Sequence, residues 1–188
     1  MLPARFAPGA LGRALEPIRP SAAPGPSGLI ASMTSPAQSL ILGVGNLLMG
    51  DEGVGVHIIR ALENERLPPT VTTLDGGTGG FHLLSLFEEF DPIIMIDATM
   101  DGAPAGTVRV LQPRFASDFP RTLSAHDIGL RDLLESASIL GPLPTLYLIT
   151  VSIDRLQSMS MELSEPVGKA IPEVLRRLYE IVAPGLTR

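Results

Sequence analysis

The chain has 188 residues, a formal net charge of −6 and no cysteine, with 45% hydrophobic and 4% aromatic residues. This length fits one ordinary domain, and the negative charge argues against a nucleic acid as partner. The absence of cysteine excludes disulfides, thiolate metal ligands and a cysteine nucleophile. No apolar run approaches the roughly 18 residues that a membrane span needs, so we expect a soluble, cytoplasmic protein with no membrane partner.

The N-terminal segment, residues 1–37, is rich in Pro, Ala, Gly and Ser and has no sustained period of 2 or 3.6. This composition predicts a disordered or dispensable extension. The segment has no apolar stretch of the length that a secretory signal requires. A start codon assigned too far upstream is the plainer explanation, with Met33 as the natural first residue and residues 38–188 as the working domain.

Predicted strands and helices alternate from Ser39 onward. Strands are expected at residues 39–45, 70–75, 92–97, 106–112 and 145–152. Helices are expected at residues 53–65, 81–90, 125–138 and 165–182, with Pro172 either kinking the last helix or marking its true start. The alternation predicts an α/β sandwich with a mostly parallel sheet, in which the wholly apolar strand 92–97 is central.

One strand is expected to run against the others. Only about eight residues join Asp97 to Gly106, fewer than the dozen or so that a helical crossover needs. The strand at 106–112 should therefore be antiparallel to its neighbours. The loop at 113–124 spans up to about 40 Å when extended, enough to return the chain to the carboxyl edge of the sheet, where the helix at 125–138 begins.

The stretch ILGVGNLLMGDEGVGVHIIRAL, residues 41–62, begins like a dinucleotide-binding turn. The third glycine of that fingerprint is missing, because Gly43 and Gly45 are followed by Leu48. The match therefore fails.

Two acids, Asp51 and Glu52, are predicted in the first helical turn, where a pyrophosphate would need free N–H groups. Two anions there would repel a third. We interpret Asp51 as the helix cap, which contributes about 1 kcal/mol. Glu52 becomes a candidate ligand only if other ligand-type residues converge on the same edge.

Two further residues are expected to converge on that edge. Asp97 ends the central strand, and His126 begins the helix to which the return loop leads. Taken singly, a strand-end Asp can be a turn former and a lone His can be an exposed first-turn residue. Together with Glu52 they form an oxygen and nitrogen set suited to Zn²⁺ or Ni²⁺. Three protein ligands leave positions open for water or for groups of another molecule.

The ordered motifs GVGNLLMGDEGVGVHIIRAL, LDGGTGG, IIMIDA and SAHDIGL resemble those of the nickel-iron hydrogenase maturation endopeptidases. The resemblance extends from Leu40 to the C-terminal helix. It implies a phosphorylase/hydrolase-like fold, a three-layer α/β/α sandwich around a twisted five-stranded sheet with one antiparallel strand. It also implies metal contacts by Glu52, Asp97 and His126.

The function implied by this resemblance is removal of a C-terminal peptide from the hydrogenase large-subunit precursor after nickel insertion. The nickel would be supplied by the substrate, held by the substrate's cysteines, rather than permanently bound. This would account for the absence of cysteine in the chain. We expect the protein to act as a monomer.

For the chemical step, Glu52 or Asp97 is the expected catalytic base. The loop DGGTGG, with Asp75, Gly76, Gly77 and Thr78, is a candidate for positioning the substrate and for supplying oxyanion-binding amides. A tight strand-to-helix connection explains the same loop equally well.

Two other functions fit the sequence. One is a stand-alone, aminopeptidase-like metallohydrolase that keeps its own zinc. The other is a non-catalytic nickel chaperone or assembly adaptor that binds the large-subunit precursor without cutting it.

Overall fold

The structure, a computed structural model, describes residues 38–115, 118 and 130–183. The predicted extension 1–37, with Met33, lies outside the described residues. The strands are β1 (Ser39–Gly43), β2 (Val71–Asp75), β3 (Ile93–Thr99), β4 (Val108–Leu111) and β5 (Leu146–Ser152). The helices are α1 (Val54–Leu62), α2 (Leu86–Glu89), α3 (Leu130–Leu140) and α4 (Glu165–Val182), with 3₁₀ turns η1 (Gly50–Gly53) and η2 (Phe81–Leu83).

The strands form one sheet in the order β2-β1-β3-β5-β4. The pairs β1–β2, β1–β3 and β3–β5 are parallel, and β4 pairs antiparallel with β5. The predicted mostly parallel sheet and its antiparallel strand are therefore confirmed. The short connection after β3 leaves no room for a helical crossover, so the chain must return in the opposite direction. β3 is central and buried throughout, as its apolar sequence predicts.

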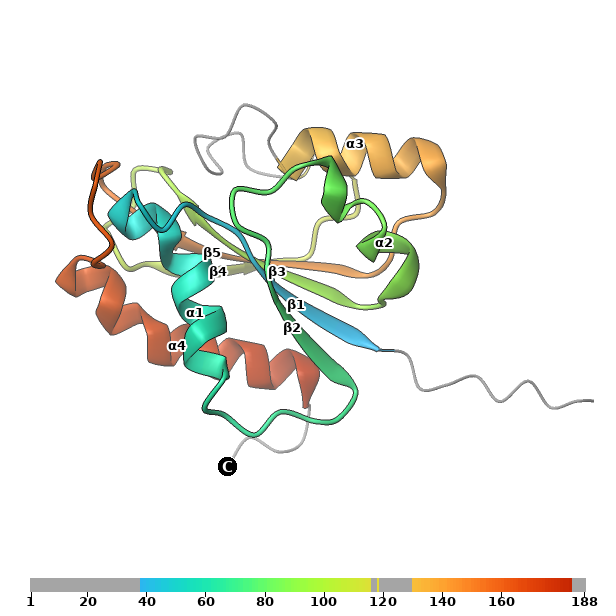
Figure 1. The fold of residues 1–188 in the computed structure, drawn as a ribbon, viewed down its shortest axis with the longest axis horizontal. Coiled ribbons are helices and arrows are strands. Elements are labelled where there is room, and N and C mark those ends of the chain that lie inside the picture. The colour runs from blue at the N-terminus through green and yellow to red at the C-terminus, as the bar shows by residue number, and fades with distance from the viewer. Residues whose placement is uncertain (1–37, 116–117, 119–129, 184–188) are drawn as a thin grey trace, which may run out of the picture. The chain divides into compact units, whose positions relative to one another are not determined.

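Helices cover both faces of the sheet, with α1 and α4 on one face and α2 and α3 on the other (Figure 1). Neighbouring strand residues alternate between the two layers, because successive side chains of a strand point to opposite faces. Ile94 packs in the layer of α1 and α4, whereas Met95 packs in the layer of α2 and α3. The predicted three-layer sandwich is confirmed.

One apolar stripe of α1 is buried. Its members are fully or almost fully buried: Val54, Ile58, Ile59 and Leu62. They recur at helical spacing, so one face of α1 packs on the sheet.

Two helix predictions differ from the structure. The segment 81–90 is not one helix but a 3₁₀ turn, η2, followed by the single turn α2. Its three Phe, one His and one Ser all have modest helix propensity. Pro172 does not mark the start of the last helix, because α4 begins at Glu165 and continues through Pro172. No helix among the described residues is both long and apolar enough to cross a bilayer.

Candidate functional site

Glu52 lies in η1, and glycines allow this turn to approach the ends of the central strands. A Cβ on Gly55 would lie 2.3 Å from the carbonyl oxygen of Val44 and 2.5 Å from that of Ile96. Gly45 has a φ of +144°, and a Cβ there would lie 2.1 Å from the carbonyl oxygen of Glu52. These positions need glycine because any side chain would push the turn away from the sheet.

The Glu52 side chain is completely buried. Its Oε2 accepts a hydrogen bond of 3.0 Å from the backbone N–H of Asn46. η1 packs against β3, the strand that carries Asp97. The glycine loop thus folds back on Glu52 and holds its carboxylate inside the protein, at the carboxyl end of the sheet.

Asp97 is also completely buried. The sequence predicted it as the last strand residue, but β3 continues through Ala98 and Thr99, because both pair with β5. Gly43, the last residue of β1, pairs with Ile96 of β3. Asp97 therefore lies one residue past the carboxyl end of β1. Its Oδ1 accepts a hydrogen bond of 2.8 Å from the N–H of Ala98. Asp97 therefore reaches the same region of the sheet as η1.

The third predicted ligand, His126, lies outside the described residues. Within the ranges that the structure describes, no three His, Asp or Glu side chains are grouped so that they could hold a metal ion. The structure therefore brings the elements of two predicted ligands together, and the position of His126 stays a prediction.

The DGGTGG loop reaches the same edge from β2. The N–H of Gly45 donates to the carbonyl oxygen of Gly77 at 2.7 Å, and the N–H of Gly76 donates to that of Gly43 at 2.9 Å. Asp75 ends β2, is exposed, and accepts a 2.8 Å hydrogen bond from the N–H of Gly77. The loop is thus tied to the turn that leads toward Glu52.

These contacts bear on the predicted oxyanion role. The N–H groups of Gly76, Gly77 and Gly79 all donate within the protein. They could bind a substrate oxygen only if the loop rearranged. Thr78, the remaining predicted positioning residue, lies at the tip of the same turn.

The interpretation of Asp51 as a helix cap is wrong. Neither η1 nor α1 has a side-chain cap. Asp51 instead accepts hydrogen bonds from the N–H of Ser164 at 2.6 Å and from the Gln157 side-chain amide at 2.9 Å. Its own N–H donates to Gln157 Oε1 at 2.8 Å. Asp51 therefore fastens η1 to the loop that precedes α4.

Sequence reasoning missed that loop, residues 157–164. Gln157 is 106 residues from Asp51, and no motif or period links the two. The loop also forms a parallel bridge between Met49 and Ser160. Only the fold brings these segments together.

Asp101 stabilises the connection after β3. Burial would raise the pKa of Asp101, but hydrogen bonds from the Ala103 N–H and the Ser152 hydroxyl, with the charge of Arg109, lower it overall. The Ser152 hydroxyl donates to Asp101 Oδ1 at 2.9 Å. This network anchors the β3–β4 loop to β5.

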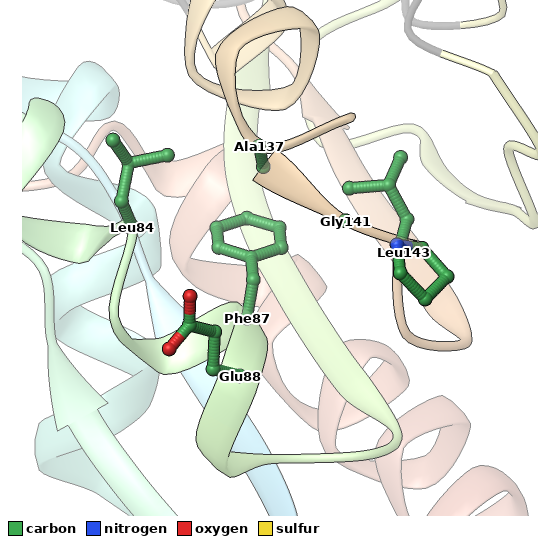
Figure 2. A pocket seen from close by; sticks show the side chains of 7 residues that line it. Leu84, Phe87, Glu88, Ala137, Gly141 and Leu143 are labelled. Carbon is green, nitrogen blue, oxygen red and sulfur yellow. The ribbon is translucent and has the colours of Figure 1, made fainter. Parts of the chain in front are cut away.

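A pocket of about 360 Å³ lies between α2 and α3 (Figure 2). The Phe87 ring and the side chains of Leu84 and Leu143 border it, and Glu88 supplies one carboxylate. None of the predicted site residues lines this pocket. It is separate from the edge that carries Glu52 and Asp97.

Comparisons with known proteins agree on one family. The family model described as HycI, hydrogenase maturation protease, matches residues 56–181. The chain is 37% identical over 157 residues to the hydrogenase expression/formation protein HoxM of Azotobacter vinelandii, covering 80% of this chain and 74% of that protein. It is 35% identical over 156 residues to the hydrogenase 2 maturation protease of Escherichia coli, covering 79% and 95%.

A solved structure also supports similarity to hydrogenase maturation proteases. The structure of the hydrogenase maturating endopeptidase HybD from E. coli superposes with a TM-score of 0.71 at 33% identity, covering 79% of this chain and 94% of that one. The similarity therefore extends over nearly the whole of that protein.

Proposed function

The chain belongs to the hydrogenase maturation protease family, whose members process the hydrogenase large subunit, and we propose that it removes a C-terminal peptide from the nickel-loaded precursor. Nickel is part of the substrate in this proposal. The precursor's sulfur ligands hold the metal, and the protease recognises the precursor through this bound nickel.

The observation that carries the proposal is the burial of Glu52 and Asp97 at one edge of the sheet. Burying a carboxylate is costly unless the group is neutral, hydrogen-bonded or bound to a cation. Both groups are held by elements that pack against each other, η1 and β3. Oxygen ligands prepared in this way suit a divalent cation that arrives from outside.

Recognition of the nickel uses Glu52 and Asp97 together with His126. These oxygen and nitrogen ligands fill coordination positions that the precursor's sulfur atoms leave open. A nickel-free precursor lacks this link. A difference of about 3 kcal/mol in binding free energy gives roughly hundredfold discrimination between the two precursors.

The chemical step is hydrolysis of one peptide bond. A carboxylate, Glu52 or Asp97, takes a proton from the attacking water as the water oxygen bonds to the carbonyl carbon. The proton passes to the leaving amine as the C–N bond breaks. Asp75 and the Gly76–Gly77–Thr78 turn flank the same edge and position the substrate tail.

The proposal includes a monomer that acts in the cytoplasm, with one copy of the chain supplying all three ligands. Residues 38–188 form the working domain, and residues 1–37 are dispensable for processing.

The test is to incubate the purified protein with nickel-loaded and nickel-free precursor and to measure the mass of the large subunit. We expect loss of a C-terminal peptide from the nickel-loaded precursor alone. Equal cleavage of both precursors would contradict recognition through nickel. A stable complex without loss of mass would indicate an adaptor, and cleavage of small free peptides with tightly bound zinc would indicate a stand-alone hydrolase.

A further inference from the structure

Leu48, Met159 and Met161 form an exposed apolar area next to η1, called here the Met159 surface. Their exposed fractions are 54%, 88% and 54%. The N–H of Ser160 donates to the carbonyl oxygen of Leu48 at 3.1 Å, and the N–H of Gly50 donates to that of Ser160 at 2.7 Å. The three side chains therefore project from two backbone segments that lie side by side, the turn before η1 and the loop before α4 (Figure 1).

Met159 has an unusual backbone conformation. Its φ is +60°, and it is the one non-glycine with positive φ among the described residues. This left-handed region suits glycine and is costly for a residue with a Cβ. The Met159 side chain is almost fully exposed, so burial in the core does not offset that cost. Strain of this kind is typical of functional positions.

The Met159 surface is fastened next to Glu52. Asp51 and Gln157 exchange two hydrogen bonds, and Asp51 also accepts the N–H of Ser164. These bonds join both ends of the loop 157–164 to η1, the turn that contains Glu52. The apolar side chains are thus held next to the turn that contains Glu52.

We propose that the Met159 surface docks an apolar area of the large-subunit precursor that flanks its C-terminal peptide. This inference rests on the proposed function. The turn that contains Leu48 leads directly into η1, so a precursor whose peptide bond reaches Glu52 would pass close to this turn. Methionines suit such a contact, since their flexible, polarisable side chains adapt to the partner's shape. Exposed apolar areas beside a site are typical of protein contacts.

The test is the variant Met159→Gly in the full chain. Glycine accepts the φ of +60°, so this variant deletes the side chain without opposing the loop conformation. We expect an unchanged or higher unfolding temperature, an unchanged kcat, and a KM for the nickel-loaded precursor that rises about tenfold.

The matched control is Ile139→Ala. Ile139 is 85% exposed but lies on α3, so its replacement should leave KM unchanged. A second variant, Leu48→Gln with Met161→Gln, should raise KM like Met159→Gly. Unchanged KM in both Met159-surface variants would overturn the proposal.

Direct binding of the precursor separates this inference from the proposed function. If the wild-type protein cuts both precursors equally, recognition through nickel fails. Weaker precursor binding by Met159→Gly than by Ile139→Ala would still support the docking surface. If the wild-type protein cuts only the nickel-loaded precursor and Met159→Gly binds it as tightly, the docking surface alone is refuted.

Discussion

Acidic residues on α4 and at the carboxyl edge of the sheet lie in opposite surroundings. On α4, the Glu173 side chain is 39% exposed and pairs with Arg176 at 2.6 Å and with Arg177 at 2.9 Å. Glu52 and Asp97 have no exposed surface. The α4 acids stay in water and gain a little from helical ion pairs. The buried acids are removed from water, and each accepts a hydrogen bond from a backbone N–H, that of Asn46 for Glu52 and that of Ala98 for Asp97.

Replacing the buried acids by amides should have the largest effect on activity. Glu52→Gln and Asp97→Asn keep an oxygen that can accept from the backbone N–H of Asn46 and of Ala98, but each replaces one carboxylate oxygen of a proposed nickel ligand by an amide nitrogen. We expect processing of the nickel-loaded precursor to fall by on the order of a hundredfold or more. The unfolding temperature should stay close to that of the wild-type protein, because the amides keep the hydrogen bonds from the backbone N–H groups of Asn46 and Ala98. Mass spectrometry of the large subunit and thermal unfolding measure the two effects.

Glu173→Gln is the matched control from α4. Its processing rate and unfolding temperature should equal those of the wild-type protein, because exposed ion pairs contribute little. If Glu52→Gln processes the precursor as fast as Glu173→Gln does, the buried carboxylate of Glu52 is not needed for processing.

Glycine substitutions extend the comparison to the backbone. Gly55→Ala places a Cβ against two backbone carbonyl oxygens, so we expect a loss of about 2–3 kcal/mol in unfolding free energy. Gly168→Ala on α4 meets nothing within 4 Å and should stabilise by about 0.5–1 kcal/mol. Denaturant unfolding measures both. Equal stability of the two variants would mean that the close approach of α1 to the strand ends is unimportant.

Asp51 provides a buried acid with a structural role. Asp51→Asn replaces one of the two acceptor oxygens by an NH2 group, so only one of the hydrogen bonds from the Ser164 N–H and the Gln157 side-chain amide can persist. We expect a loss of about 1–2 kcal/mol in unfolding free energy, in contrast to Glu52→Gln. Thermal unfolding of both variants distinguishes them, and a greater loss in Glu52→Gln would reverse our assignment of roles.

The smallest expected effect concerns His57 on α1, next to the loop 157–164. Burial lowers the pKa of His57, the carbonyl of Met161 opposes this, and Arg60 lowers it further. His57 therefore takes up a proton at a higher pH in the unfolded chain than in the folded protein. As pH falls below about 6.5, protonation favours the unfolded chain and the free energy of unfolding decreases. His57→Gln should remove this part of the pH dependence. Unfolding temperatures of the wild-type protein and of His57→Gln are measured above and below that pH. An equal loss of stability in the two proteins on acidification would refute this role of His57.

Much of the fold followed from local patterns. The apolar β3 sequence placed that strand at the centre, and the short connection after it fixed the direction of β4. The break at 81–90 was not predicted, because apolar periodicity alone does not reveal where a weak helix ends.

The candidate site was harder to predict. Glu52 and Asp97 could be placed because strand order brings their elements to one edge. The role of Asp51 could not, because its partners Gln157 and Ser164 are distant in the sequence and polar contacts leave no periodic signal. The Met159 surface was missed for the same reason, since it depends on the bridge between Met49 and Ser160.

The most direct test of the central claim is X-ray absorption at the nickel of the precursor, measured alone and in complex with the protein frozen before cleavage. We predict that oxygen or nitrogen ligands from the protein appear around nickel in the wild-type complex and decrease in the complexes of Glu52→Gln and Asp97→Asn. An unchanged nickel spectrum in a wild-type complex that goes on to cleave the precursor would contradict the account.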